Sequence, residues 1–357
     1  MAEQLNLSTT DAVEYFFDRG WTDGLPIVPP TPELVEEFLA IVGLEADDIL
    51  GSVSERDRHL TAEKAAINSV MAGCKAEYFP VVVAALEAIL DPEFNAHAAM
   101  SSTGGAALCL IVSGPLVEEL GFFHLNNALG SGNRANASIG RAVRLVAMNV
   151  FGAKTGMMDA SSIGHPGKYS MVVAETQPPE GWPTFAKELG AAPNRTSVTV
   201  LAAEGPRQIA NHLNPDPKGW LLTIASAMRC PATFSVGKGA QVAVVLGYEA
   251  RELLSREGWS KGDIRSFLAE HSRISAEELE AAGVFLEVGS AHNMIPEADG
   301  LLPTVPSPTD ILLVTAGGPG AGWCAYMPAW APVQHSRATS RLVAKTGHSE
   351  TIGGSDV

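Results

Sequence analysis

The sequence has few charged residues for its length. Charged side chains make up 18% of the 357 residues and apolar side chains 46%, whereas about 25% charged residues is typical of soluble domains. Such a chain can bury a large core but has little charge to cover a big monomer, so we expect a homo-oligomer, most simply a two-fold dimer. The same composition excludes an intrinsically disordered chain.

Basic residues are scarcer than acidic ones. The 24 Lys and Arg residues stand against 40 Asp and Glu residues, which leaves a formal net charge of −16. Because a strongly acidic chain repels a phosphate backbone, we expect no general binding to nucleic acid. A local basic pocket for a small anion is compatible with this charge.

Long apolar runs and paired cysteines are absent as well. No uncharged apolar run reaches the ~18 residues of a membrane span, and residues 1–20 lack the basic start and apolar stretch of a secretory signal. The cysteines at positions 74, 109, 230 and 324 form neither a CxxC pair nor a zinc spacing. We therefore expect a cytoplasmic protein with reduced thiols, no membrane segment and no motif-encoded metal site.

Short apolar runs alternate with helical patterns along most of the chain. Residues 107–112, 241–246 and 311–314 have the composition of buried strands, and each run leads into a glycine turn. Strands that are apolar on both faces are typical of parallel sheets covered by helices. We therefore predict an α/β fold with a mainly parallel, helix-flanked sheet.

Two of these strand–turn–helix segments look alike. LCLIVSGPLVEEL aligns with VAVVLGYEARELL when Gly114 is placed over Gly247. This similarity indicates an internal duplication into two similar halves, although any two such units could resemble each other this closely. We predict an N-terminal lead-in with a proline-rich arm at residues 1–60, a first α/β half at 61–177 and a second at 178–357.

A polar, glycine-rich loop opens an apolar helix at residues 124–141. Glycines let backbone N–H groups approach a ligand, and a helix N-terminus favours negative charge. Arg134 could form a bidentate pair with a carboxylate or phosphate, so we predict an anion site; the alternative is an ordinary asparagine-capped loop. The third glycine of a dinucleotide-binding fingerprint is missing. The predicted substrate-binding residues are Asn127, Ser131, Asn133, Arg134, Asn136 and, from an earlier small-residue loop, His97.

A second candidate segment is DASSIGHPGKYS at residues 159–170. His165 lies between a glycine and a proline, so a rigid turn holds its ring. Lys168 and Tyr169 follow closely, and all three side chain types can act as acids or bases. We predict His165, Lys168 and Tyr169 to be catalytic; the alternative is a surface turn.

The third candidate is GGPGAGWCAYMPAW at residues 317–330. A strand that runs into a glycine-rich turn is a common place for α/β active sites. Cys324 could be a nucleophile here if its pKa were lowered. The alternative is a buried, inert cysteine beside Trp323.

Four motifs together resemble a largely uncharacterised bacterial family: TDGLPIVPPT, INSVMAGCKAEYFPVV, GSGNRANASIGRA and GHPGKYS. They cover most of residues 22–175. Near the C-terminus, ILLVTAGGPGAGWC is similar to the UGSC-type domain that is linked to selenoproteins and thioredoxin-like redox proteins. If that pattern maps onto residues 321–324, its first redox position is Ala321, which removes a two-residue redox pair.

These observations leave three hypotheses for function. The leading one is an enzyme of small-molecule metabolism, a lyase, hydratase or hydrolase that acts on a small polar or anionic substrate. The second is thiol-dependent chemistry at Cys324. The third is a non-catalytic ligand-binding protein or an accessory subunit of a larger complex with a partner protein. No motif identifies a cofactor.

Overall fold

The computed structural model describes residues 7–352 apart from 213, 232, 234–235 and 285–295. The helices are α1 (Thr9–Asp18), α2 (Pro32–Val42), α3 (Ala62–Met71), α4 (Phe79–Ile89), α5 (Ala96–Ser101), α6 (Leu116–Glu119), α7 (Arg134–Asn149), α8 (Phe185–Glu188), α9 (Pro217–Met228), α10 (Tyr248–Arg256), α11 (Lys261–His271) and α12 (Ala276–Ala281). The strands are β1 (Ile49–Val53), β2 (Arg58–Thr61), β3 (Ala107–Ser113), β4 (Met171–Ala174), β5 (Ser197–Ala203), β6 (Arg207–Ala210), β7 (Ala240–Leu246), β8 (Ile274–Ser275), β9 (Leu301–Leu302), β10 (Ile311–Thr315), β11 (Trp323–Pro332), β12 (Thr339–Leu342) and β13 (Glu350–Thr351).

The centre of the fold is a mixed sheet in which nine of the described strands take part. Two pairs are parallel, β3 with β4 and β7 with β10. The other pairs are antiparallel, including β3 with β5 and β7 with β11. The predicted α/β class is confirmed, but the prediction of a mainly parallel sheet is wrong.

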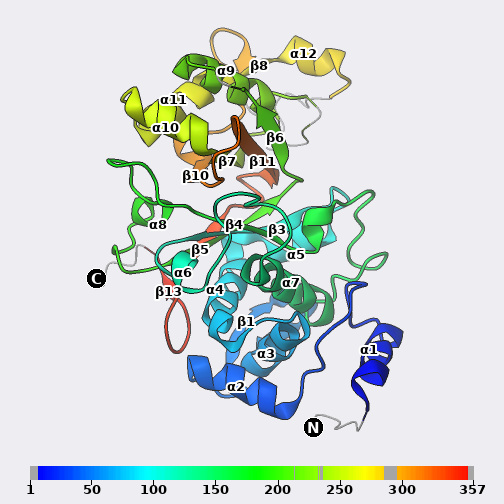
Figure 1. The fold of residues 1–357 in the computed structure, drawn as a ribbon. Helices are drawn as coiled ribbons and strands as arrows, with labels where there is room; N and C mark the ends of the chain where they lie inside the picture. The colour runs from blue at the N-terminus through cyan, green and yellow to red at the C-terminus, as the bar shows by residue number, and fades with distance from the viewer. Residues whose placement is uncertain (1–6, 213, 232, 234–235, 285–295, 353–357) are drawn as a thin grey trace, which may run out of the picture.

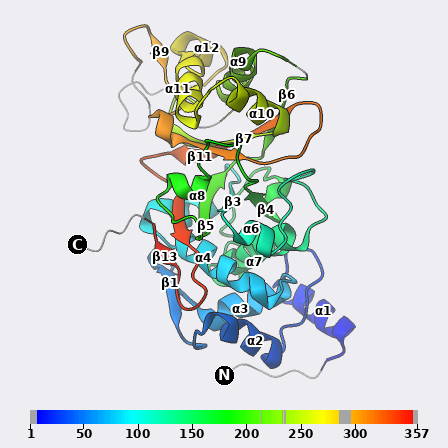
Figure 2. The ribbon, with the colours of Figure 1, turned by 60° about the vertical axis from the view of Figure 1, so that its left-hand side comes forward.

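The sheet is divided into two halves that face each other. Alternate residues of β3, β4 and β5 share one apolar cluster with alternate residues of β7, β10 and β11. Helices α4 and α7 cover the outer face of the first half, and α9 to α11 cover the outer face of the second (Figures 1 and 2). Each central strand is therefore buried on both faces, by helices on the outside and by the other half of the sheet on the inside. Strands that are apolar on both faces thus occur here in a mostly antiparallel sheet, which is why the apolar pattern wrongly indicated a parallel one.

The two halves have the same pairing pattern and exchange a strand. In each half the first strand pairs parallel with the second and antiparallel with the third. Strand β6 follows β5 but pairs with β11, whereas β12 follows β11 but pairs with β5. This correspondence is what a duplication would produce, although the duplication itself stays a prediction.

The two aligned glycines occupy corresponding places in these halves. Gly114 follows β3 and Gly247 follows β7, and each is pressed against the start of the antiparallel neighbour. A Cβ atom at Gly114 would lie 2.5 Å from the carbonyl oxygen of Arg195, and one at Gly247 would lie 1.7 Å from that of Trp323. No side chain fits in either position, so backbone packing requires glycine at both.

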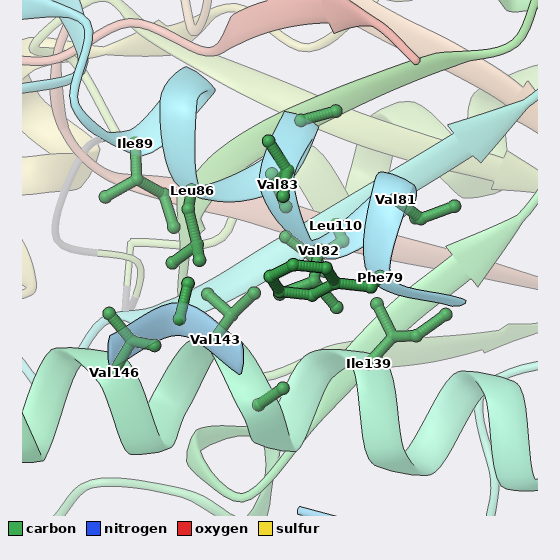
Figure 3. Packing of buried hydrophobic residues seen from close by; sticks show 14 of the residues in the cluster. Phe79, Val81, Val82, Val83, Leu86, Ile89, Leu110, Ile139, Val143 and Val146 are labelled. Carbon is green, nitrogen blue, oxygen red and sulfur yellow. The ribbon is translucent and has the colours of Figure 1, made fainter. Parts of the chain in front are cut away.

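Helix α7 is the central helix of the first half. Its inner face packs on α4 and β3 through buried aliphatic side chains such as Val143 and Val146 (Figure 3). At Gly140 the helix comes close to β4, because a Cβ atom there would lie 2.3 Å from Ser170 Oγ. This contact places the second half of α7 against the 159–170 segment.

The proline-rich arm crosses the outside of α7. Arg141 donates two hydrogen bonds to the Asp23 carboxylate, both 2.8 Å, and further bonds to the carbonyls of Leu25 and Pro26. Asn149 donates to the Trp21 carbonyl. The arm is thus fixed on the helix by side chains. Within the described parts of the chain, no helix is both long and apolar enough to cross a membrane.

Candidate functional site

An open pocket of about 720 Å³ lies between the N-terminal arm, the C-terminal part of α7 and the loop that leads to β4. The predicted residues His165, Lys168 and Tyr169 all line it. Half of the Tyr169 side chain is exposed at this pocket. The other residues of the lining are Gly20, Thr22, Asp23, Arg144, Met148, Lys154, Thr155, Met157, Asp159, Ser161, Ile163, Gly164 and Pro166.

A buried carboxylate organises one wall of this pocket. Asp159, whose side chain is 2% exposed, accepts hydrogen bonds of 2.8 Å from Arg144 and from Lys168. Burial alone would raise the pKa of Asp159, but the bonds from Lys168, Ser161 and Arg144 outweigh it and lower the pKa to about 2. The carboxylate therefore stays ionised and holds both cations in place.

Ser161 completes the network. Its hydroxyl donates a hydrogen bond to the Asp159 carboxylate and accepts one of 2.6 Å from Lys168 Nζ. Lys168 is half-buried, and burial is the main reason why its pKa is lowered from the usual value; the nearby Arg144 charge acts in the same direction and Asp159 opposes both. A hydroxyl, an amine and a carboxylate thus converge at the pocket wall.

The loop that carries these groups folds around two glycines. Gly164 has a φ of +65° and packs against Gly105, where a Cβ atom would lie 3.0 Å from the Gly164 Cα. The amide of Ser162 donates to the Thr103 carbonyl at 3.0 Å. These contacts fix the turn between Ser161 and His165 and bring Lys168 back towards Ser161.

His165 is held in one tautomer by its own turn. Its Nδ1 accepts a hydrogen bond from the Gly167 amide, so the neutral ring carries its proton on Nε2. This Nε2 is buried and makes no hydrogen bond with any described group. Burial lowers the pKa of His165, although the backbone of Ala203 lies near enough to favour the charged ring. The geometry makes His165 a neutral hydrogen-bond donor and leaves no ring lone pair free to accept a proton.

The predicted anion site of the 124–141 segment has a structural explanation. Asn133 caps α7 and accepts the Asn136 amide, and the buried Asn136 side chain bonds the backbone of Phe123. Arg134 donates to the carbonyls of Gly73 and Cys74. The remaining two predicted residues bond each other, since Asn127 donates to the Ser131 carbonyl.

None of these five residues lines the pocket. Arg134 begins α7 and Arg144 lies ten residues further along, about 15 Å at the rise of an α-helix. Arg134 therefore does not share the pocket with His165 and Lys168. His97 is also elsewhere, where its Nδ1 accepts a hydrogen bond of 3.1 Å from Arg56.

The glycine-rich turn at 317–322 lies beside the 124–129 loop, away from this pocket. The Gly317 amide donates to the His124 carbonyl. Three successive amides, those of Gly320, Ala321 and Gly322, donate to the carboxylate of Glu249. The amides that could have stabilised an oxyanion beside a cysteine are thus already used by a side chain of the same chain.

Cys324 is buried at the start of β11. Burial raises the pKa of its thiol to about 12, and the opposing effects of the Gly247 backbone and Arg251 do not offset this. A thiol in this state is not ionised at neutral pH. The described residues hold no cluster of three or more His, Cys, Asp and Glu side chains that could bind a metal ion.

Arg144, Lys154 and Asp23 line the pocket but were not among the residues predicted from the sequence. Arg144 follows Arg141 by three positions, so both project from neighbouring faces of one helix. Two arginines at this spacing in an apolar helix were a signal for buried carboxylate partners. Nothing in the sequence indicated which carboxylates they would meet.

Comparisons with known proteins add no assignment. No protein-family model matches the chain, and no curated protein matches it significantly. The resemblances to a bacterial family and to UGSC-type domains therefore stay predictions.

Proposed function

We propose that the chain is a hydrolase of small-molecule metabolism whose nucleophile is Ser161. The observation that carries the proposal is the 2.6 Å distance between Ser161 Oγ and Lys168 Nζ on the wall of an open pocket. A hydroxyl within reach of a base that a third group orients is the arrangement that activates a serine. Asp159 is that third group. Among the lyase, hydratase and hydrolase reactions expected from the sequence, this arrangement favours the hydrolase.

In this proposal, Lys168 pairs with Asp159 as a cation in the resting protein and acts after it has lost its proton. The neutral amine then takes the hydroxyl proton of Ser161 while Oγ attacks a carbonyl carbon of the substrate. The new Oγ–C bond turns the carbonyl into a tetrahedral oxyanion. Its collapse breaks the bond to the leaving group, which receives the proton from Lys168. Water then cleaves the acyl-serine and restores both side chains. Arg144, which bonds Asp159 beside Lys168, keeps positive charge near the developing oxyanion.

The protonation state of Lys168 sets the pH dependence. Lys168 must be neutral to accept the proton, and burial lowers its pKa in the direction that this requires. We therefore expect kcat/KM to rise with pH as Lys168 loses its proton and to be lost at acidic pH. A His165 base would give the same direction at lower pH, but its lone pair on Nδ1 is already engaged.

A fluorophosphonate probe tests the proposal without knowledge of the substrate, because it modifies activated serines covalently. We expect one probe per wild-type chain, mapped to Ser161 by mass spectrometry of peptides. Ser161→Ala should abolish labelling, and Lys168→Met should slow it by about a hundredfold or more, the range of general base catalysis. The rate of labelling should increase with pH.

Ser162 provides the matched control, since it is exposed and adjacent in the same loop. Ser162→Ala should label at the wild-type rate. Labelling at Ser162, labelling that is unchanged in Lys168→Met, or no labelling at all would refute Ser161 as nucleophile. A pocket that binds ligands in the absence of labelling would make the chain a ligand-binding protein instead.

A further inference from the structure

Lys154 has a charge that no described residue neutralises. It lies in the loop after α7, lines the pocket, and has no ion pair or hydrogen bond from its ammonium group to another described residue. Its Nζ lies beside the N-terminal arm, 3.7 Å from where a Cβ atom of Gly20 would be. Lys154 is only partly exposed, and a ligand anion at the pocket could form a charge-assisted hydrogen bond with its ammonium group.

The other charges of the pocket lining are paired. Asp23 is neutralised by Arg141 from outside the lining. Asp159 pairs with both Arg144 and Lys168, so one negative charge lies between two positive charges. With Lys154, the pocket has an excess of positive charge in a chain whose formal net charge is −16. This local excess favours the binding of an anion at the pocket.

Apolar side chains gather around the same pocket. Ile163 is 94% exposed, Met157 is 76% exposed and Tyr169 is 50% exposed, and all three line the pocket. Exposed large apolar side chains are ordinary when scattered singly, but a group around one opening marks a binding surface. The pocket volume of about 720 Å³ fits a ligand of drug-like size rather than a very small polar molecule.

We propose that the substrate is an amphipathic carboxylate: its free carboxylate binds Lys154 beside the N-terminal arm, and its apolar body lies against Met157, Ile163 and Tyr169. The proposal rests on the proposed function, because the hydrolysable ester or amide bond of the same molecule would then face Ser161. It goes beyond that function in naming what the rest of the substrate must contain.

A carboxylate fits this environment better than a phosphate. Phosphate sites commonly use several backbone amides or a helix N-terminus. Here the pocket lies beside the C-terminal part of α7, whose partial negative charge opposes a dianion. The amide cluster at 320–322 is already bound to Glu249. A single ammonium group matches one carboxylate.

The test measures binding by calorimetry with four probes: phenylacetate, phenylacetamide, acetate and phenyl phosphate. We expect phenylacetate to bind more tightly than the other three. Lys154→Met should weaken phenylacetate binding by about tenfold, the loss of one charge-assisted contact, and Lys154→Arg should retain most of it. Lys75→Met is the matched control because Lys75 pairs with Glu77 away from the pocket; it should bind like the wild type.

The outcomes separate the two proposals because Ser161 labelling plays no part in this readout. Equal binding of acetate would overturn the apolar part, and tighter binding of phenyl phosphate would overturn the carboxylate. The same affinity in Lys154→Met, or no binding of phenylacetate to the wild type, would overturn the role of Lys154. Lys154-dependent binding of phenylacetate by a chain that no fluorophosphonate labels would uphold this inference and refute the hydrolase.

Discussion

Two glycine-rich turns of this molecule each present a side chain of nucleophilic type, and their surroundings differ. In the 159–168 turn, the Ser161 hydroxyl lies at a pocket within 2.6 Å of Lys168, and Asp159 orients both. In the 317–324 turn, Cys324 is buried and the amides of the turn bind Glu249. Three amides of the second turn are already bound by Glu249, whereas the pocket at the first turn has a charge excess and exposed apolar side chains. Whether charged and apolar groups remain available to a ligand is therefore a better guide to function than the type of nucleophile.

Of the substitutions that test this difference between the turns, Asp159→Asn should reduce the free energy of unfolding most. The change leaves the Arg144 and Lys168 charges facing a neutral amide in a partly buried site, so we expect a loss of about 2 kcal/mol in the free energy of unfolding. The measurement is urea denaturation across a range of pH. Because the pKa of Asp159 is lowered from 3.8 to about 2, its contribution is present above pH 4 and disappears as the pH falls to about 2.

The exposed Asp57 is the control for that change, since its side chain is 98% exposed. Asp57→Asn should leave the free energy of unfolding within about 0.5 kcal/mol of the wild type. A loss in Asp159→Asn that is no larger than this, or that persists unchanged at pH 2, would show that the network does not hold the turn.

A smaller effect is expected at the other turn. Glu249→Gln removes the charge from three amide hydrogen bonds at a partly exposed site, so we expect a loss of about 1 kcal/mol in the free energy of unfolding at pH 7. Burial opposes ionisation, but the amide bonds of the turn lower the pKa of Glu249 below 4.5. The stabilisation is therefore present above that value and lost as the pH falls through the lowered pKa.

Denaturation of the wild type and Glu249→Gln at pH 7 and pH 3 measures this difference, which should shrink at the acidic pH. Glu36→Gln, at an exposed position of α2, should differ little from the wild type at both. Labelling of Ser161 should be the same in Glu249→Gln as in the wild type. A variant that loses labelling here would mean that the two turns are coupled.

The smallest effect should be seen at Cys324. With a pKa of about 12 and a buried sulfur, it should not react with iodoacetamide in the folded protein at pH 8, whereas the intermediate exposure of Cys230 permits slow reaction there. Intact mass and peptide mapping count and locate the adducts. Rapid alkylation of Cys324 that also abolishes turnover would favour the thiol hypothesis over Ser161.

Much of the local structure could be predicted from short patterns. The pair Thr31-Pro32 is typical of a helix start, and in the structure Thr31 caps α2 while Pro32 is its first residue. The apolar run at 171–174 is β4. β11 was missed because Pro328 lies in its middle, which is unusual for a strand with partners on both sides. Apolar periodicity indicates which residues are buried but not the direction in which a strand runs. The prediction of a mainly parallel sheet was wrong for this reason.

The candidate site could be predicted only where it is local. His165, Lys168 and Tyr169 lie in one turn and do line one pocket. Arg144 reaches it from α7 and Lys154 from the loop after that helix. The distance between α7 and the turn depends on the close packing at Gly140. Residues 124–141 are rich in polar side chains, but the fold itself uses them to cap α7 and to bond backbone carbonyls. One sequence does not distinguish polar groups that the fold uses from those that it leaves for a ligand.

The exchange of β6 and β12 between the halves has a consequence for biogenesis. Residues 339–342 complete the edge of β5, whose residues 197–200 are synthesised about 140 positions earlier. During translation the β5 edge of the first half therefore lacks its β12 partner until nearly the whole chain has left the ribosome. A truncation before residue 339 should expose that edge to other chains, so loss of a short C-terminal piece would harm the half that was made first.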